Sequence, residues 1–267
     1  MDPISIKRPS DPYDLIWNEQ PLPHFCYSLF SPYAHLSHAV LTRHGGMSRG
    51  PYHSLNTSFG VGDHPDHVAA NLHIIRDFLG ARRLIHMKQV HGTRILAVHR
   101  EDEKKEVFMP SADALITDAP GLALLVKQAD CQGVILFDPG RRVVAVVHCG
   151  WRGNANNILS KTTARMQREF GCRACDLLAC IGPSLGPCCA EFVDHEKLFP
   201  EALKVVQVNG TAFFDLKAFS RRQLLDAGLK KEHIQVSGLC TRCRTDLFYS
   251  YRGEGRTGRF GTVAMLT

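Results

Sequence analysis

The stretch ALLVKQADCQGVILFDPGRRVVAVVHCGWRG, residues 123–153, decides the fold of this chain. It contains two apolar runs, Val134–Phe137 and Val143–Val147, separated by turn residues at 138–140. Short apolar runs bounded by turn residues are typical of buried strands, so we predict a hairpin here. A third apolar run, Leu122–Val126, predicts another strand directly before it.

Residues able to carry chemistry stand at the ends of these strands. Cys131 precedes the first strand of the hairpin, and His148 ends the second. Because the turn lies between them at a similar distance from each, antiparallel pairing places the thiol roughly opposite the imidazole. This pattern indicates a functional site, although a buried small thiol and a strand-end histidine of the core would also produce it.

The composition is that of an ordinary globular protein. Of 267 residues, 44% are hydrophobic and 22% are charged, which is enough apolar material for a substantial core. The net charge of +6 suits an anionic or phosphate-bearing small molecule. The basic residues are scattered and form no long block of like charge, so we expect no binding to nucleic acid.

The sequence predicts a cytoplasmic protein without a membrane partner. No stretch approaches the roughly eighteen consecutive apolar residues of a membrane-spanning helix, and the N-terminus carries no hydrophobic signal core. In a reducing compartment the ten cysteines are expected to serve as core residues, metal ligands or nucleophiles rather than as disulfides.

Strand and helix patterns mix along the chain without strict alternation. Five prolines in residues 1–23 predict a loosely ordered lead-in, and residues 24–267 predict a single domain. The Gly-, Ser- and Asn-rich residues 42–63 predict a long loop of the kind that often carries function. We expect helices from Asp63 or Asp66 to Gly80, over Asn154–Phe170 and over Asp215–Gly228, and further strands over residues 38–41, 94–98, 112–117, 176–182 and 260–266. This order predicts an α+β protein, a mixed-sheet α/β/α layered sandwich, rather than a doubly wound parallel fold.

Three residues, His91, Cys131 and His148, form a candidate metal site. Each lies close to a glycine or at a strand end. Two imidazoles and a thiolate leave the fourth position of a tetrahedral zinc ion open, as in catalytic zinc sites. Water bound at that position becomes acidic enough to attack an electrophilic carbon near neutral pH. The three residues are far apart in sequence, so spacing alone leaves open that they are unrelated core or loop residues.

Seven short strings strengthen this assignment. They are TRHGGMSRGPYHSLN (42–56), VGDHP (61–65), KQVHG (88–92), ADC (129–131), HCGWRG (148–153), IGPSLGPCC (181–189) and TGR (257–259). Together they resemble the laccase-domain (polyphenol oxidase-like) family, which includes purine nucleoside phosphorylases with adenosine deaminase activity. The resemblance extends over roughly residues 38–267, nearly the whole chain.

The resemblance implies a zinc ion held by His91, Cys131 and His148. It also implies phosphorolysis of adenosine, inosine and S-methyl-5'-thioadenosine to the free base and ribose 1-phosphate, and deamination of adenosine. Purine nucleosides and phosphate are therefore the expected partners. The chain departs from the family pattern at Gln132-Gly133 and at Cys149, which affects the lining of the site but none of the three expected ligands.

Four further residues are candidates for binding substrate or phosphate. Arg43, in the long loop, offers a bidentate fork to phosphate or ribose, and a surface arginine is the alternative. Arg152 is a candidate for binding phosphate or for stabilising its loop. Asp130 is a candidate for orienting a ligand imidazole or holding a purine, and Gln89 for reading a base edge or satisfying backbone groups.

Two cysteine patterns and one glycine pattern carry less weight. Cys172-x-x-Cys175 and Cys240-x-x-Cys243 are candidates for a four-cysteine zinc site, but they lie too far apart for a compact zinc ribbon. Cys188 and Cys189, which are neighbours in the sequence, are expected to pack in the core near the C-terminal strand. Residues 253–258, GEGRTG, precede a predicted strand, whereas a dinucleotide fingerprint opens a helix. We interpret them as a turn from which Arg256 or Arg259 reaches an anion.

Copper is less expected than zinc. None of the fourteen histidines forms a His-x-His pair, from which cupredoxin-type laccases build their trinuclear copper site. The combination of His-x-Glu with Pro-Cys-x-x-Cys, typical of zinc deaminases, is also missing. The alternatives are a hydrolase with a Cys131–His148 nucleophile and base, a copper-dependent phenol oxidase, and a zinc-binding module without catalysis.

Overall fold

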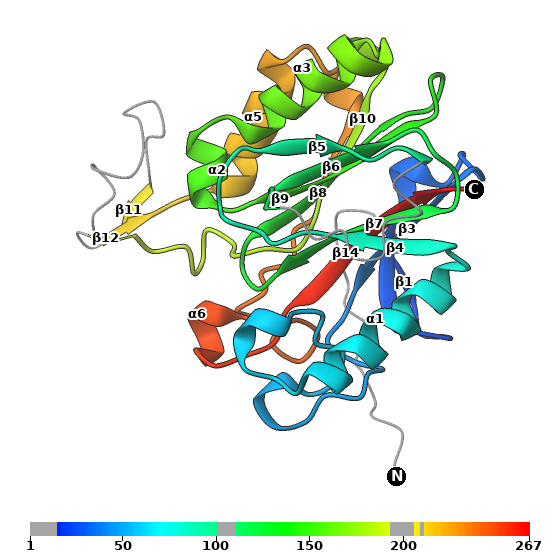
Figure 1. Ribbon diagram of the computed structural model, residues 1–267. Helices are drawn as coiled ribbons and strands as arrows, with labels where there is room; N and C mark the ends of the chain where they lie inside the picture. The colour runs from blue at the N-terminus through cyan, green and yellow to red at the C-terminus, as the bar shows by residue number, and fades with distance from the viewer. Residues whose placement is uncertain (1–14, 101–110, 193–205, 209–210) are drawn as a thin grey trace.

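The hairpin predicted from residues 123–153 forms the centre of the protein (Figure 1). The computed structural model describes residues 15–100, 111–192, 206–208 and 211–267. β8 (Gln132–Asp138) and β9 (Val143–Cys149) pair antiparallel, and every residue of both strands is buried. Asp138 closes the turn by accepting hydrogen bonds from the backbone N–H groups of Gly140 and Arg141, at 3.0 and 2.9 Å.

The hairpin belongs to a mixed sheet, here called the upper sheet after its place in Figure 1. Its strand order is β13-β10-β8-β9-β6-β5. The edge pairs β10–β13 and β5–β6 are parallel, and the pairs between them are antiparallel. The flanking strands are β5 (Ile95–Ala97), β6 (Ala114–Thr117), β10 (Leu178–Ile181) and β13 (Ile234–Val236).

A second mixed sheet, the lower sheet, packs against the first. Its strand order is β1-β2-β3-β14-β7-β4, with only the pair β4–β7 parallel among these strands. The strands are β1 (Leu15–Asn18), β2 (His24–Tyr27), β3 (Leu36–Leu41), β4 (Arg83–His86), β7 (Leu122–Gln128) and β14 (Phe260–Leu266). A short hairpin of β11 (Val206–Val208) and β12 (Thr211–Phe213) stands apart from both sheets.

Helices cover the outer faces of the two sheets. On the upper sheet lie α2 (Trp151–Ala155), α3 (Ile158–Phe170) and α5 (Leu216–Asp226), and on the lower sheet lies α1 (Pro65–Leu79). The short α6 (Tyr251–Glu254) precedes β14. Single 3-10 turns are η1 (Ser28–Phe30), η2 (Gly50–Tyr52), η3 (Phe59–Val61), η5 (Ala174–Asp176) and η6 (Lys231–His233).

Three of the four hydrophobic clusters among the described residues lie on the faces of the two sheets, and the fourth is a small group of Ala212, Phe214 and Leu216. Ile135 and Val144 of the upper sheet pack with Leu124 of the lower sheet in the cluster between them. A second cluster joins the upper sheet to α3 and α5, and a third joins the lower sheet to α1. The predicted α+β class and mixed sheets are confirmed. The layer order is helix, sheet, sheet, helix, one sheet more than expected, because a strand buried on both faces does not reveal whether a helix or a sheet covers it.

Several predicted elements differ at their ends from those observed. Part of the predicted lead-in, Leu15–Asn18, is strand β1, while residues 1–14 lie outside the described part of the chain. The predicted helix over residues 154–170 is divided into α2 and α3, because Asn157 adopts a left-handed conformation with φ of 58°. Neither predicted cap opens α1: the side chain of His64 accepts the hydrogen bond from the N–H of Asp66.

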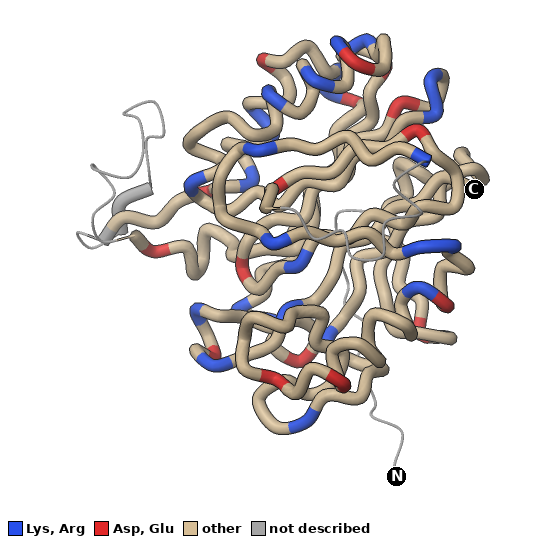
Figure 2. Tube along the Cα trace, in the orientation of Figure 1, with Lys and Arg blue, Asp and Glu red and all other residues tan. Residues whose placement is uncertain are grey.

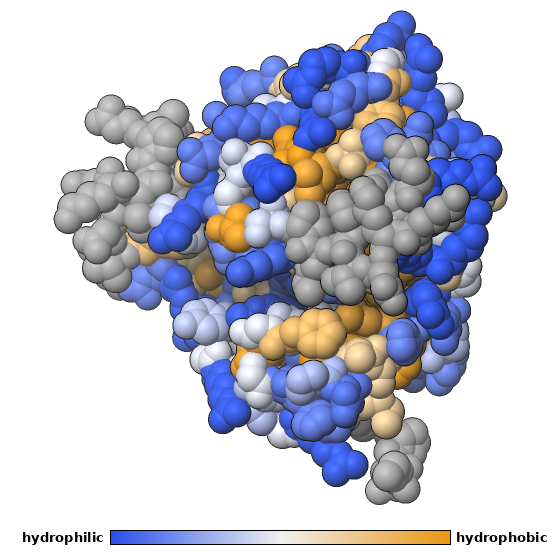
Figure 3. All heavy atoms as spheres, in the orientation of Figure 1, coloured by the Kyte–Doolittle hydropathy of each residue, from blue (hydrophilic) through white to orange (hydrophobic). Residues whose placement is uncertain are grey.

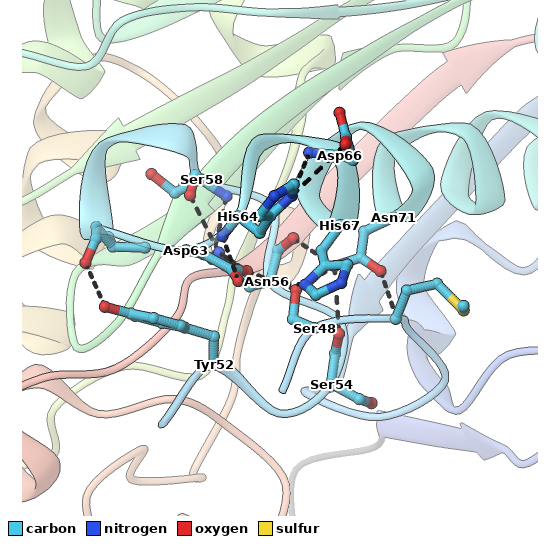
Figure 4. A network of polar contacts seen from close by, with 12 residues as sticks. Ser48, Tyr52, Ser54, Asn56, Ser58, Asp63, His64, Asp66, His67 and Asn71 are labelled. Atoms are coloured by element: carbon cyan, nitrogen blue, oxygen red, sulfur yellow. Dashed lines mark hydrogen bonds and ion pairs between the residues drawn. The ribbon is translucent and has the colours of Figure 1, made fainter. Parts of the chain in front are cut away.

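The long loop before α1 is folded around buried polar side chains (Figure 4). Asn71 of α1 donates hydrogen bonds to the Ser48 hydroxyl and to the carbonyl groups of Ser54 and Asn56, at 2.8–3.2 Å. Asp63 in turn accepts hydrogen bonds from the side chains of Ser48 and Asn56. Together with the buried side chains of Tyr52 and Leu55, these bonds hold the last turn of the loop, η3, at a defined place beside the site described next.

Among the described residues, no helix has both the length and the apolar character needed to cross a membrane.

Candidate active site

The three candidate ligands converge at one end of the central hairpin. Cys131 directly precedes β8, His148 lies near the end of β9, and His91 comes from the loop between β4 and β5. The His91 Nε2 atom lies 3.8 Å from the Cys131 sulfur, and the ligand atoms of all three residues lie within 4.8 Å of one another. The two imidazole rings are nearly perpendicular, with centroids 4.8 Å apart. The grouping predicted from the sequence is therefore a spatial cluster.

The pairing register differs by two residues from the one predicted. His148 pairs with Gly133 rather than with Cys131, which places Cys131 just beyond the last pair, beside Gly150. A Cβ atom on Gly150 would lie 2.9 Å from the His91 ring and 3.1 Å from the Cys131 sulfur. A side chain at this position would push His91 and Cys131 out of their present places, so glycine leaves room for the cluster.

A buried carboxylate, Asp113, orients both histidines. Its side chain accepts a hydrogen bond from the Nδ1 atom of His148 at 2.9 Å, so the Nε2 atom of that ring remains for the cluster. It also accepts hydrogen bonds from the backbone N–H groups of His91 and Gly92, at 2.9 and 2.7 Å. These bonds hold His91 in a left-handed conformation, with φ of 58°.

Asp113, rather than Asp130, thus has the orienting role considered for Asp130 in the sequence. The signal was an acidic residue at the start of an otherwise apolar strand, in the string SADALIT (111–117). Such a carboxylate is costly to bury unless hydrogen bonds compensate it.

The charges within the cluster are coupled. Burial opposes ionisation of Cys131, but the charge and hydrogen bonds of His148 and His91 outweigh it and lower the pKa of the thiol to about 6. Burial likewise opposes protonation of His148, but the Cys131 thiolate and Asp113 raise the pKa of that imidazole to about 9. The cluster therefore favours a thiolate, which is both a strong ligand for zinc and a nucleophile.

The cluster opens into a cavity of about 900 Å³. His91 is exposed to it, whereas His148 is only 3% exposed. Apolar and aromatic side chains form much of the wall: Phe59, Val61, Trp151, Leu185, Phe192, Leu216 and Tyr251. Figure 3 shows one face of the molecule, on which orange apolar residues lie in patches among mostly blue hydrophilic residues.

Basic side chains give the cavity its charge. Lys88, Lys127, Arg252 and Arg259 line it together with the acidic Asp130. Lysines and arginines are otherwise interspersed with acidic residues along the chain (Figure 2), so the local excess comes from these few groups. Lys127 is 9% exposed. Burial lowers the pKa of Lys127 to about 8, so it is positively charged at neutral pH.

Lys127 was missed in the sequence because it lies within a strand. The signal was a lysine inside the otherwise apolar run LALLVKQ (122–128), all of which is buried in β7. Arg259, one of the two arginines predicted to reach an anion from the glycine-rich turn at 253–258, does line the cavity. Arg256, its alternative, bonds to the hydroxyl of Tyr52 instead.

The four predicted substrate residues fall into two groups. Gln89 and Asp130 line the cavity, but their polar atoms are engaged. The Gln89 amide bridges both backbone groups of Lys127. Arg43 and Arg152 are not among the described residues that line it. Arg43 bonds to Glu254 and to the Thr245 carbonyl group and stacks on Tyr249, and Arg152 stacks on Trp151, which itself lines the cavity.

The cysteine pairs meet in an unexpected combination. Cys240 and Cys243 lie beside Cys188 and Cys189, and not beside the pair at 172 and 175. The sequence offers Cys172 as a zinc ligand. In the structure it is buried in the hydrophobic cluster that joins the upper sheet to α3 and α5. The expectation that Cys188 and Cys189 pack in the core is wrong, because Cys188 is exposed and Cys189 only half-buried.

Comparisons with known proteins identify relatives of this chain. Purine nucleoside phosphorylase YlmD of Geobacillus stearothermophilus is 34% identical over 244 residues, which cover 85% of this chain and 89% of that protein. The purine nucleoside phosphorylase of Bacteroides thetaiotaomicron is 31% identical over 258 residues, covering 90% of this chain and 95% of that protein.

Solved structures have the same fold. The crystal structure of YlmD from Geobacillus stearothermophilus has a TM-score of 0.85 at 31% identity, covering 94% of this chain and 99% of that one. The Bacillus licheniformis hypothetical protein YfiH has the same TM-score at 30% identity. Residues 37–267 match the family described as multi-copper polyphenol oxidoreductase laccase. The chain therefore belongs to this laccase-like family.

Proposed function

We propose that this protein is a zinc-dependent purine nucleoside phosphorylase with adenosine deaminase activity. Its substrates would be adenosine, inosine and S-methyl-5'-thioadenosine, and its products the free base and a ribose 1-phosphate. The observation that carries the proposal is one cavity in which a metal-type cluster, buried positive charge and aromatic walls meet. Relatives named purine nucleoside phosphorylase support it.

The basic side chains suit the phosphate that phosphorolysis requires. Lys127 brings a positive charge into a largely buried position, where an anion is attracted more strongly than in water. Arg252 and Arg259 add guanidinium groups suited to phosphate oxygens. In the reaction a phosphate oxygen bonds to C1' of the ribose as the bond from C1' to the purine nitrogen breaks, and the base leaves with a proton.

The aromatic side chains suit the purine. Phe59, Trp151, Phe192 and Tyr251 line the cavity, and aromatic faces stack on bases without a strict requirement for one base. This tolerance supports activity on both adenine and hypoxanthine nucleosides.

The residues of the cluster fit a zinc ion. His91, Cys131 and His148 would hold it, since two imidazoles and a thiolate are zinc ligands and Gly150 leaves them room. When bound, zinc supplies a Lewis acid beside the substrate, chemistry that deamination of adenosine also requires. Asp113 fixes the tautomer of His148 and so presents its Nε2 atom to the ion.

A hydrolase without metal is the second candidate, because the cluster favours a thiolate beside a protonated imidazole. A low-pKa Cys131 next to His148 is the arrangement of nucleophile and base in cysteine enzymes. A copper-dependent phenol oxidase has less support, since the cluster offers three ligands and the chain has no His-x-His pair.

We place the enzyme in the cytoplasm, where free cysteines such as the ten of this chain are ordinary. Its partners there would be purine nucleosides and phosphate.

The experiment is chromatography of adenosine and inosine after incubation with the purified protein, with and without phosphate. We expect adenine and hypoxanthine only when phosphate is present, and inosine from adenosine without it. Both activities should be lost in Cys131→Ala and retained in Cys175→Ala, a matched change of a half-buried thiol away from the cavity. If zinc is bound and neither nucleoside changes, the proposal fails. Activity that survives metal removal and is stopped by thiol alkylation would favour the hydrolase.

A further inference from the structure

A second cluster, here called the four-thiol cluster, lies outside the ligand group just described. It consists of Cys188, Cys189, Cys240 and Cys243, whose sulfur atoms all lie within 4.8 Å of one another. The Cys243 sulfur is 3.7 Å from that of Cys188 and 3.6 Å from that of Cys189. None of the four is joined in a disulfide.

The fold brings the two cysteine pairs together through one parallel strand pair. β10 and β13 are parallel neighbours and end at the same edge of the upper sheet, at Ile181 and Val236. The segments that follow therefore run side by side, with a bridge between Ser184 and Cys240. Residues separated by more than fifty positions meet for this reason.

The spacing is that of four ligands around one ion. Zinc–sulfur bonds of about 2.3 Å in a tetrahedron place neighbouring sulfur atoms about 3.8 Å apart. The two sulfur–sulfur distances at Cys243 are close to this edge. A disulfide would require about 2.05 Å, and a core of unrelated thiols would not leave Cys188 and Cys243 exposed.

The surrounding backbone also suits a metal–thiolate cluster. The backbone N–H of Gly186 donates a hydrogen bond to the Cys240 sulfur at 3.3 Å, a contact that orients a thiolate ligand. A Cβ on Gly186 would lie 3.1 Å from the Cys240 Cβ and 3.4 Å from the Cys188 sulfur. The turn is closed by a hydrogen bond from the N–H of Cys189 to the Gly186 carbonyl group.

We propose that the four-thiol cluster binds a second, structural zinc ion. Four soft thiolate ligands favour zinc and complete its tetrahedral shell, leaving no position for substrate. This proposal does not depend on the proposed function, because its ligands, its ion and its test are separate from the three-ligand cluster.

The position of the four-thiol cluster suggests that the ion would stabilise one wall of the cavity. The segments that it would join carry Leu185 and Phe192 on one side and Tyr251 and Arg252 on the other, and all four line the cavity. Already the guanidinium of Arg252 donates to the carbonyl group of Glu191 at 2.7 Å. The zinc ion would fasten these segments together and thereby fix one wall of the cavity.

Asp130 connects this wall to the active-site cluster. Its carboxylate accepts hydrogen bonds from the hydroxyl groups of Thr241 and Ser250, both at 2.7 Å, and from the backbone N–H of Arg252 at 2.6 Å. Asp130 directly precedes Cys131. Loosening of the four-thiol cluster should therefore weaken substrate binding at this wall, and Asp130 would carry part of the disturbance to Cys131.

The test compares metal content and sulfur coordination in the purified full-length protein. We expect Cys188→Ser/Cys243→Ser to contain one zinc per chain fewer than the unmodified protein, whatever the three-ligand cluster holds. The matched control, Cys175→Ser, changes a half-buried Cys-x-x-Cys thiol outside both clusters and should lose none. After cobalt exchange, the absorption of a tetrahedral cobalt thiolate should remain in Cys131→Ser and be largely lost in the double variant.

Two results would overturn the proposal. One is an unchanged zinc content in the double variant; the other is a disulfide among the four cysteines in protein purified under reducing, metal-replete conditions. Should the double variant fold poorly, Cys243→Asp supplies a weaker oxygen ligand at the exposed position, and partial zinc loss is expected. Failure of the purine assay with the second zinc present would refute only the proposed function.

Discussion

The active-site cluster and the four-thiol cluster differ in the number of side chains that each offers to a metal ion. The active-site cluster offers two imidazoles and one thiol and faces the cavity through the exposed His91. The four-thiol cluster offers four thiols, enough to complete a tetrahedral shell. The number of protein ligands therefore distinguishes a catalytic metal site from a structural one. Three ligands leave a coordination position for substrate, whereas four ligands fill the tetrahedral shell and only join two segments of the chain.

The largest effect on turnover is expected from a change in the active-site cluster. Cys131→Ser should reduce turnover of nucleosides by about 10³-fold or more, because a bound metal contributes several kcal/mol to transition-state stabilisation. Steady-state kinetics with adenosine and phosphate measures this loss, and the melting temperature should change little. Cys243→Ser serves as the opposite case, with lower thermal stability and substantial remaining turnover. Equal loss of turnover in both variants would contradict a catalytic role for the active-site cluster and a structural role for the four-thiol cluster.

The second prediction concerns Asp113, the buried carboxylate behind the active-site cluster. Asp113→Asn keeps the shape of the side chain but removes the charge that orients His148. Zinc affinity of the active-site cluster should fall by about 10–100-fold, as is usual when a group behind a metal-bound histidine is changed. Competition with a chromophoric chelator measures it. Retention of one tightly bound zinc per chain is the internal control, since no carboxylate of the described residues bonds to the four-thiol cluster.

The central elements of the fold could be predicted because their patterns are local. The strand Phe260–Leu266 is observed with its predicted bounds, and Gly80 ends α1 as expected through its left-handed conformation. The edge strand Leu15–Asn18 was not found, since its short polar and apolar pattern lies among prolines. The second sheet was not found either, because burial on both faces gives the same apolar run against a helix or a sheet.

The residues that meet each candidate ligand in space were harder to predict than the candidate ligands themselves. The His91 N–H and the Asp113 carboxylate are 22 residues apart in sequence, and no local motif joins them. The sequence offers the Cys-x-x-Cys pair at 240 and 243 as metal ligands together with Cys172 and Cys175, whereas the structure places it beside Cys188 and Cys189. Its true neighbours depend on the parallel pairing of β10 with β13, which is a long-range property of the sheet.

A third prediction uses the buried cation of the cavity. Because burial lowers the pKa of Lys127 to about 8, its positive charge is present below that pH and lost above it. The KM for phosphate should therefore rise as the pH passes through 8, with a smaller change in kcat. Lys127→Met should raise this KM by about tenfold at pH 7, which corresponds to about 1.4 kcal/mol.

Lys127→Arg is the matched control for this pH dependence. A guanidinium remains charged well above pH 8, so the rise in KM should be flattened while phosphate is still bound. A KM for phosphate that is independent of pH between 7 and 9 in the unmodified protein would remove Lys127 from the binding site.

The smallest effect is expected where a glycine adjoins the four-thiol cluster. Gly186→Ala would place a Cβ 3.1 Å from that of Cys240, a distance that requires the neighbours to give way slightly. Overpacking of this size costs about 1 kcal/mol, which lowers the melting temperature of a chain of this length by about 2–4 °C. Turnover should be unchanged. The same substitution at Gly150, where the Cβ would meet the His91 ring at 2.9 Å, should instead reduce turnover. Scanning calorimetry together with the nucleoside assay separates these outcomes, and an exchange of the two effects would assign the catalytic role to the other cluster.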